Sequence, residues 1–336
     1  MFPCLRAAFR LACLKLLRLE EWNIGVIPLP PGGIEDLLAS ERLGRALWRA
    51  GVSRTAFLAD PILWPLAPSP RVLLEEYDYW TGRGRIKSLS LEGLLGAERP
   101  ASAISLAQHA SYPFVFPSDG SWCCIPECAE SRAVDLYVWD AGAGQWNLDA
   151  RLLEDVRVID PTLAPHEGNW YLFGTDADDG PSSKLRIWVA KSPQGPWAAH
   201  PMTPARVARD QVRPAGPLFR AGGHLYRPSQ DCRRGYGSGI ILNRIDRLSP
   251  TEYLETPVRE WRPDEESPYG EGMHTISFSA THAIIDGKRA RYTPLAAFWK
   301  AWWKVTRALR WAAQTCRAAK HTDPIPGGAS RCSPNP

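Results

Sequence analysis

The sequence predicts an all-β protein, a five-bladed β-propeller with short helical additions at its two ends. Three observations carry this prediction. One short pattern, a proline or polar pivot followed by apolar residues, a turn and an aromatic pair, occurs five times. The pivots recur about every fifty residues, which is typical of propeller blades. The 31 prolines and 27 glycines suit an all-β fold with many turns.

Each copy of the pattern predicts a β-hairpin, because turn formers such as those in 118–120 precede β-prone runs such as 121–125. The copies contain the pairs Asp60-Pro61, Tyr112-Pro113, Asp160-Pro161, Arg213-Pro214 and Met273-His274. In the first three copies a polar residue closes the hairpin at the same distance from the pivot, namely Glu75, Glu127 and Thr175. If these hairpins are the inner strands of the blades, the pivots and closing residues converge at one mouth of the central channel.

The chain divides into four predicted regions. Residues 1–50 form a peripheral region, and residues 51–292 form the propeller. Residues 293–320 form a basic, tryptophan-rich amphipathic helix, and residues 321–336 form a disordered tail rich in proline, glycine and serine. For the helix, a peripheral membrane contact through residues 295–311 and packing against the propeller or a partner are equally open interpretations.

Composition limits the function. With 44% hydrophobic residues and 15 tryptophans the chain can bury a large core. The net charge of +4 is too small to indicate a nucleic-acid partner. We expect neither a secretory signal in residues 1–19 nor a transmembrane helix. The eight cysteines show no disulfide framework. These features predict reduced thiols and a cytoplasmic protein, with membrane contact at most peripheral.

The predicted mouth gathers ionisable side chains: Asp60, Glu75, Glu127, Asp160, Arg213, Asp231 and His274. Carboxylates that converge repel one another, so at least one should keep its proton near neutral pH, as a general acid requires. We predict that Glu75, Arg213, Tyr112, Gln230 and His274 bind substrate. The alternatives are structural: an Asp-Pro pair also makes an ordinary turn, Arg213 also serves as an ion pair, and His274 also fits a hydrogen-bonded core position.

Residues 158–163 and 168–175 resemble the third-blade motif of five-bladed glycoside hydrolases of family 43, and Asp60-Pro61 resembles the first-blade motif. The resemblance implies that Asp60 is a general base and that Asp160 tunes the pKa of the acid. Met273-His274-Thr275 resembles a fifth-blade segment whose histidine lies near an axial ion, often calcium, which implies a metal site at His274.

One departure concerns the general acid, which the family 43 enzymes carry as a fourth-blade glutamate in a Glu-Gly-Pro context. The chain has Ala215-Gly216-Pro217 there. Either Glu127 or Asp231 takes over as the acid, or the protein is not a hydrolase of that type.

A broader resemblance covers roughly residues 21–290. It rests on the segments 75–79, 82–86, 112–115, 126–127, 158–163, 192–197, 213–216 and 226–232. Together they resemble the N-terminal domain of plant glucosamine inositolphosphorylceramide transferases, a domain with bacterial relatives. In the plant proteins a separate C-terminal domain resembles glycosyltransferases. Nothing of that size follows residue 290, so we do not expect transferase activity to carry over.

These observations lead to two main hypotheses. The first is a carbohydrate-active propeller, a glycoside hydrolase or transglycosylase, that acts on a glycan or sugar conjugate through Asp60, Asp160 and either Glu127 or Asp231. The second is a non-catalytic module that binds a sugar or glycolipid and assists a partner glycosyltransferase. A third interpretation is a scaffold tethered by the tryptophan-rich helix.

Overall fold

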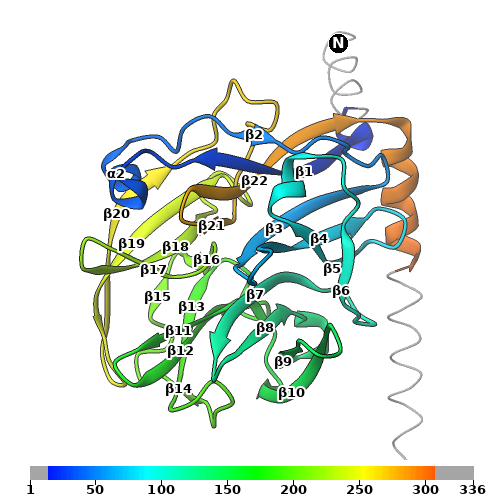
Figure 1. Ribbon diagram of the computed structural model, residues 1–336. Coiled ribbons are helices and arrows are strands. Elements are labelled where there is room, and N and C mark those ends of the chain that lie inside the picture. Colours follow the sequence, from blue (N-terminus) through cyan, green and yellow to red (C-terminus); the bar gives the residue numbers. More distant parts are fainter. Residues whose placement is uncertain (1–13, 307–336) are drawn as a thin grey trace, which may run out of the picture. The chain divides into compact units, whose positions relative to one another are not determined.

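The computed structural model describes residues 14–306 of the chain. Its strands form five sheets around one centre, which is the predicted five-bladed β-propeller (Figure 1). The propeller lies in a compact unit that spans Glu20–Arg291, and residues 14–19 and 292–306 belong to a second unit. Within that second unit a helix begins at residue 294 and is described as far as residue 306. Among the described residues, no helix is both long and apolar enough to cross a membrane.

The blades follow one another along the chain. The first contains β3 (Ala56–Trp64), β4 (Arg71–Asp78), β5 (Arg83–Ser90) and β6 (Ala101–Ile104). The second contains β7 (Ser111–Ser118), β8 (Ser121–Glu127), β9 (Ala133–Asp140) and β10 (Gln145–Glu154). The third contains β11 (Val158–His166), β12 (Asn169–Asp176), β13 (Lys184–Ala190), β14 (Ala198–Ala199) and β15 (Arg206–Val207). The fourth contains β16 (Asp210–Pro214), β17 (Phe219–Ala221), β18 (His224–Asp231), β19 (Gly239–Leu248) and β20 (Tyr253–Trp261).

The fifth blade joins the two ends of the propeller. Its strand order is β2 (Leu47–Trp48), β1 (Arg18–Pro28), β22 (His282–Tyr292) and β21 (Ile276–Phe278). The segment 1–50, expected to be peripheral, therefore supplies two blade strands, with α2 (Gly33–Ala39) between them. The physical reason is that β21 and β22 alone would leave an open strand edge, which β1 covers.

The predicted pivots lie on or just before one terminal strand of each sheet, namely β3, β7, β11, β16 and β21. In the first three blades the strand pairing is interrupted there by a β-bulge. Asp60, Tyr112 and Asp160 occupy these bulges with φ angles of 53°, 40° and 49°. A left-handed conformation is costly for residues other than glycine, and a bulge re-aims the side chain. The repeated pattern thus marks a repeated backbone distortion.

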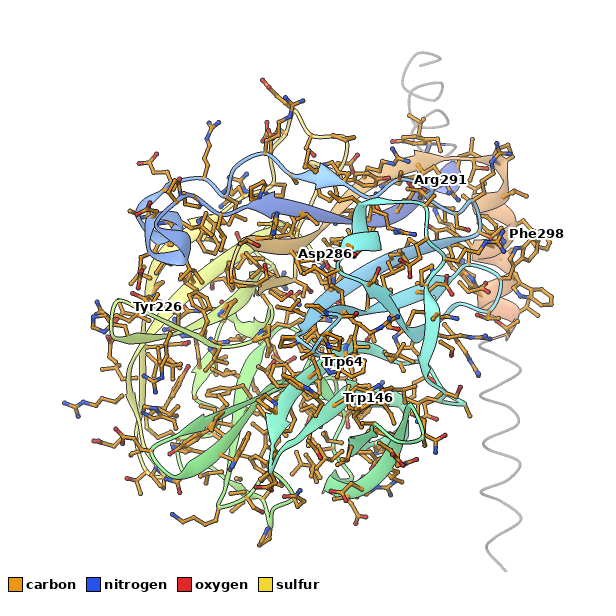
Figure 2. All side chains as sticks on the ribbon, in the orientation of Figure 1. Trp64, Trp146, Tyr226, Asp286, Arg291 and Phe298 are labelled. Atoms are coloured by element: carbon orange, nitrogen blue, oxygen red, sulfur yellow. The ribbon has the colours of Figure 1, made fainter. Side chains whose placement is uncertain are left out.

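Aromatic side chains fill the space between blades. Trp64 of β3 is buried against Trp139 and Trp146 of the second blade, with ring centroids 4.8 and 5.0 Å away. Figure 2 shows Trp64 beside Trp146. This packing, repeated in other clusters of the core, holds the inner strands of the blades in fixed positions.

Candidate functional site at the propeller axis

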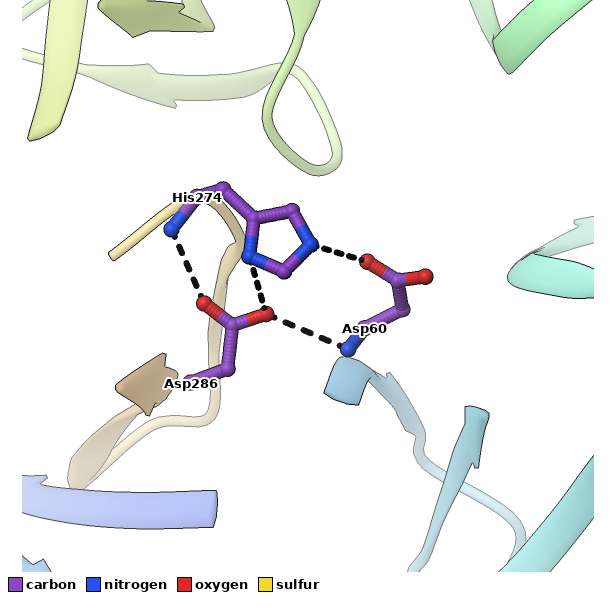
Figure 3. Close-up of side chains that lie close together, drawn as sticks. All are labelled: Asp60, His274 and Asp286. Carbon is purple, nitrogen blue, oxygen red and sulfur yellow. Dashed lines mark hydrogen bonds and ion pairs between the residues drawn. The ribbon is translucent and has the colours of Figure 1, made fainter. Parts of the chain in front are cut away.

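His274 lies between two aspartates at the centre of the propeller (Figure 3). Its Nε2 atom is 3.0 Å from Oδ1 of Asp60, and its Nδ1 atom is 2.9 Å from Oδ2 of Asp286. Asp60 belongs to β3 and Asp286 to β22, so the first and fifth blades meet at this histidine. None of the three side chains is more than 5% exposed.

The two carboxylates of this axial cluster are fully engaged. Asp60 accepts the hydroxyl of Thr275 at 3.0 Å and the backbone N–H of Tyr112 at 3.1 Å. Asp286 accepts the backbone N–H groups of His274 and Thr275 at 2.9 and 3.1 Å, and that of Asp60 at 3.2 Å. Every carboxylate oxygen therefore has a protein donor, which makes the cluster rigid.

The cluster carries its own positive charge. Burial disfavours an imidazolium, but Asp286 and Asp60 outweigh it and raise the pKa of His274 to about 10. Burial also acts against the charge on Asp60, yet His274 and the hydrogen bonds from Thr275 and Tyr112 hold the pKa of this carboxyl below its usual value. At neutral pH the cluster is an imidazolium between two carboxylates.

The ligand atoms of Asp60, His274 and Asp286 lie within 4.8 Å of one another, close enough to raise the question of a metal ion. Calcium takes roughly six to eight oxygen ligands. Here the four carboxylate oxygens already accept hydrogen bonds, and the charge that a cation would supply comes from His274. These residues do not fit the axial calcium that the family 43 resemblance implied.

A second cluster forms around Asp160. Arg213 binds this carboxylate with two nitrogens, at 2.5 Å from Nε and 3.3 Å from Nη2. The side-chain amide of Gln230 donates to Asp160 at 2.7 Å and to the carbonyl of Pro214 at 2.9 Å. The Oε1 atom of Gln230 is buried and has no donor among residues 14–306. The structure thus brings the pivots Asp160 and Arg213 together and adds Gln230, for which substrate binding stays a prediction.

Two further carboxyls near the axis, those of Glu127 and Glu75, have raised pKa values. Burial and the negative charge of Asp160 raise the pKa of Glu127 well above its usual value. Burial, Asp60 and Glu127 do the same for Glu75. The closest ion-pair partner of Glu75 is His109, at 3.9 Å, whose own pKa is lowered by burial. The convergence of carboxyls shifts these two pKa values in the direction that a general acid requires, and the protonated acid itself stays a prediction.

The remaining predicted residues have structural partners. The hydroxyl of Tyr112 lies 2.8 Å from Oγ1 of Thr162 and accepts the N–H of Gly216 at 2.8 Å. Asp231 is bound by Arg233 through two side-chain nitrogens, at 2.9 and 3.0 Å, and Arg262 lies 3.5 Å away. Despite burial, these bonds lower the pKa of Asp231, so this residue is ionised.

Aromatic and cationic side chains surround the axial cluster. The ring of Tyr236 lies 5.0 Å from that of His274, and the guanidinium of Arg213 lies 4.8 Å over the Tyr236 ring. Trp22 packs 4.2 Å from His274, and Lys288 lies 5.2 Å over Trp22 and donates to the carbonyl of Tyr236 at 2.9 Å. Tyr236 is 40% exposed, whereas Trp22 and Lys288 are buried. This aromatic and cationic rim, defined by Trp22, Arg213, Tyr236 and Lys288, therefore reaches solvent through Tyr236.

Sequence reasoning missed Asp286, Tyr236 and Trp22. Asp286 occupies the closing position of the fifth hairpin, as Glu75 and Glu127 do in the first and second. The fifth hairpin is shorter than the others, so the distance between pivot and closing residue that holds in the first three copies does not lead to Asp286. The run 283–286, three apolar residues and an aspartate at the end of a predicted strand, was the available signal. Tyr236 and Trp22 lie outside the repeated pattern, and only the fold brings them to His274.

The five sheets and the polar centre define a five-bladed β-propeller with a buried ionic cluster on its axis. Residues 46–270 match the family described as "Glucosamine inositolphosphorylceramide transferase 1, N-terminal", and the chain belongs to this family. Glucosamine inositolphosphorylceramide transferase 1 of Oryza sativa subsp. japonica is 33% identical over 208 residues, which cover 60% of this chain and 28% of the plant protein. The Arabidopsis thaliana protein of the same name is 32% identical, with 60% and 27% covered. The chain thus matches less than a third of the length of these relatives.

Solved structures with a related arrangement are glycoside hydrolases. A family 117 glycoside hydrolase from Zobellia galactanivorans has a TM-score of 0.46 and 11% identity, covering 70% of this chain and 84% of that one. An exo-β-1,3-galactanase from Phanerochaete chrysosporium has a TM-score of 0.46 and 12% identity, with 70% and 55% covered. A thermostable family 43 glycoside hydrolase has a TM-score of 0.43 and 13% identity, with 62% and 77% covered.

Proposed function

We propose that the propeller binds a glycan or sugar conjugate at the rim above its axial cluster and serves a partner glycosyltransferase as a recognition module. The observation that carries the proposal is the pairing of Arg213 with the half-exposed ring of Tyr236. An aromatic face next to fixed hydrogen-bond donors suits a sugar, which has one apolar face and many hydroxyls.

The groups beneath the rim support binding rather than bond cleavage. Asp60, Asp160 and Asp286 are bound by side chains and backbone amides, and each is at most 4% exposed. Buried carboxylates with these partners stabilise the rim above them and are not accessible to a substrate. The Oε1 atom of Gln230, beside Asp160, is fully buried as well, so it also lies out of reach of a ligand.

The relatives' name suggests the ligand class. They are called glucosamine inositolphosphorylceramide transferases, so we propose the headgroup of a glycolipid, or a soluble conjugate of the same kind, as the ligand. Calorimetric titration with soluble inositol glycosides and simple monosaccharides tests this. Tyr236→Ala should abolish measurable binding, whereas Tyr236→Phe keeps the ring and should bind like the parent protein. The outer-blade variant Tyr226→Ala is the matched control. Equal binding by the parent protein and by Tyr236→Ala would show that the rim is not the binding site.

A second candidate function is glycoside hydrolysis or transglycosylation, and the raised pKa of Glu127, which binds the backbone N–H of Asp160, favours it. In this scheme Asp60 is the base or nucleophile, Glu127 the acid and Asp160 the residue that raises the acid's pKa. Asp231 is the weaker choice for the acid because its pKa is lowered by Arg233. Release of nitrophenol from a panel of nitrophenyl glycosides provides the assay. If the Glu127→Gln and Asp60→Asn variants both turn over the substrate like the parent protein, these residues are not the acid and the base of the reaction.

For the C-terminal helix we propose a peripheral membrane contact. Leu295, Phe298, Trp302 and Val305 recur every three or four residues and are 44–52% exposed, which makes one apolar helix face. Part of the predicted contact, 307–311, lies outside the described residues, as does the predicted tail 321–336. Flotation with anionic vesicles should show loss of binding in a Leu295→Ser/Val305→Ser double variant. Unchanged flotation would favour a contact with protein instead.

We also propose a reducing, cytoplasmic environment. Cys123, Cys124 and Cys128 are buried free thiols in the second blade, and Cys232 is free and partly buried. Acid-quenched thiol labelling of protein from its own cells should detect these cysteines as reduced. Recovery of a disulfide-linked form would contradict the proposal.

A further inference from the structure

A cavity of about 1000 Å³ opens beside the fifth blade, and we call it the fifth-blade cavity. It is lined by the segment between α2 and β2, by the loop that follows β20, and by parts of β1 and β22. None of the four rim residues lines it. Its volume is at the upper end of the range of small-molecule sites. The cavity is therefore large enough for a ligand of its own, and an inference about it goes beyond the proposed function.

The floor of the cavity is apolar. Five of its residues are at most 7% exposed: Ile27, Leu43, Tyr269, Met273 and Ile285. Trp48 also lines the cavity, with its ring 4.9 Å from that of Tyr269. A Cβ atom at position 287 would lie 2.1 Å from Cη2 of Trp48, so Gly287 lets the indole lie against β22. Such a floor favours the apolar part of a ligand, because burial removes apolar surface from water.

Charged side chains of opposite sign form two lips of the cavity. The first lip, on residues 41–46, holds two arginines and one carboxylate: Arg42, Arg45 and Glu41. The second lip, on residues 260–267, holds four carboxylates and one arginine: Glu260, Asp264, Glu265, Glu266 and Arg262. A hydrogen bond of 2.7 Å from Nε1 of Trp48 to the hydroxyl of Ser267 connects the two segments. The first lip thus has an excess of positive charge, and the second an excess of negative charge.

Part of this charge has no partner in the protein. On the second lip Arg262 pairs with Glu260, and Asp264 accepts the backbone N–H of residue 266 at 3.1 Å. Four other charged side chains of the lips are exposed and make no hydrogen bond or ion pair within residues 14–306: Arg42, Arg45, Glu265 and Glu266. Both lips therefore have charged groups that are available to a ligand.

These features together favour a dipolar ligand with an apolar body. A ligand of a single charge would be attracted by one lip and repelled by the other. A carboxylate suits Arg42 and Arg45, because arginine binds it in a bidentate manner, and an ammonium suits Glu265 and Glu266. Apolar side chains between the two charged ends would cover the floor. A short peptide with apolar side chains and free ends has all three parts.

We propose that the fifth-blade cavity binds a short apolar peptide by its two free ends. The carboxylate of the peptide binds Arg42 and Arg45, its ammonium binds Glu265 and Glu266, and its side chains lie on the floor around Trp48. The site uses no rim residue, so its failure would leave the rim proposal unchanged, and the converse also holds.

The first measurement finds a peptide probe. An equimolar library of tripeptides made of alanine, valine, leucine and phenylalanine is ultrafiltered with the full chain, and mass spectrometry identifies the peptides that the protein retains. The proposal expects retention of members with large side chains, because these cover more of the apolar floor. If the protein retains no member of the library, the proposal is wrong.

Calorimetric titration then compares the best-retained tripeptide with its C-terminal amide and with its N-acetyl form. Each modification removes one charge and should weaken binding to the parent protein about threefold to tenfold, since the lips are exposed and partly screened. The Arg42→Gln/Arg45→Gln variant should bind the free peptide and the amide equally. The Glu265→Gln/Glu266→Gln variant should bind the free peptide and the N-acetyl form equally. All four substituted side chains are exposed, so the fold should tolerate these changes.

The matched control is the Arg247→Gln/Glu252→Gln variant, which removes an exposed ion pair elsewhere in the fourth blade. It should respond to both modifications as the parent protein does. If the two lip variants also respond like the parent protein, the peptide binds elsewhere and the assignment is wrong. If neither modification weakens binding to the parent protein, the ends of the peptide are not recognised, and the assignment is wrong as well.

Discussion

Glu127 accepts the backbone N–H of Asp160 at 2.9 Å, so the closing residue of the second blade binds the pivot of the third. The same relationship recurs once, where Asp286 of the fifth blade accepts the N–H of Asp60. In the remaining contact one pivot binds the next, since Asp60 accepts the N–H of Tyr112. Each pivot is in the left-handed region, at a bulge where its N–H leaves the strand pairing. A carboxyl of the preceding blade thus stabilises each distorted backbone and links successive blades.

This relationship predicts how Glu127 variants behave. Glu127→Gln keeps an oxygen that can accept the N–H of Asp160 and keeps the neutral state, so the free energy of unfolding should change by less than about 1 kcal/mol. Glu127→Ala leaves a buried N–H unpaired and should cost about 1–3 kcal/mol. Urea denaturation measures both, with the exposed Glu130→Ala as control. Equal destabilisation by Gln and Ala would show that an ionised carboxylate is required.

Tyr112→Phe should destabilise the protein by about 1–2 kcal/mol. The hydroxyl joins Thr162 of the third blade to the N–H of Gly216 of the fourth, and both partners lose a buried hydrogen bond without it. The control is Tyr226→Phe, which removes a hydroxyl from the outer part of the fourth blade. Thermal unfolding of the two variants compares them, and equal midpoints would mean that the Tyr112 hydroxyl contributes nothing net.

The protein should become less stable as the pH rises from 6.5 to 8.5. The folded state keeps a proton on His274, whose pKa is about 10, whereas the unfolded histidine loses it near 6.5. This contribution is therefore complete below pH 6.5 and is lost toward pH 10. The raised pKa values of Glu75 and Glu127 act in the same direction. One proton corresponds to about 1.4 kcal/mol per pH unit.

Urea midpoints at pH 6.5, 7.5 and 8.5 measure this effect. Between pH 6.5 and 7.5 the unfolded thiols remain largely protonated, so this interval reports the effect of His274 and the two glutamates. Near pH 8.5 the unfolded thiols ionise and lower the stability further, because burial raises the pKa values of Cys123, Cys124 and Cys128 in the folded state. The Glu127→Gln variant, which lacks one of the titrating carboxyls, should show a shallower decline. A midpoint that stays constant or rises with pH would mean that His274 is neutral in the folded protein.

Calcium should not stabilise the propeller. The carboxylate oxygens of Asp60 and Asp286 already accept protein hydrogen bonds, and His274 supplies the compensating charge. Thermal melting of the protein after EDTA treatment, and again with excess calcium, should therefore give the same midpoint. A midpoint that falls with EDTA and returns with calcium would show that the cluster opens to hold an ion.

The fold could be predicted from the sequence because propeller blades repeat. Asp60, Tyr112 and Asp160 mark the inner strand of three blades, and the register confirms that the residue before each pivot pairs with Glu75, Glu127 or Thr175. Local hairpins of this kind are encoded by turn residues and alternating apolar side chains, so the blade count follows from the chain itself.

The candidate site was only partly predictable. The repeat placed Asp60, Asp160, Arg213 and His274 near one centre, but it did not indicate which partner each would take. Asp160 pairs with Arg213, and Asp231 pairs with Arg233. His274 lies between Asp60 and Asp286. These pairings depend on side-chain positions that are set only when the five blades are packed together.

The sequence by itself determined the architecture, the pivots and the gathering of carboxyls, because these follow from short patterns with a fixed period. The tertiary structure decided how the ring closes, since β1 and β2 reach the fifth sheet from the other end of the chain. It also decided the directions in which the pKa values of Glu75, Glu127 and His274 are shifted. The reason is that a pKa depends on burial and on the charges nearby, and those are fixed only when all five blades are in place.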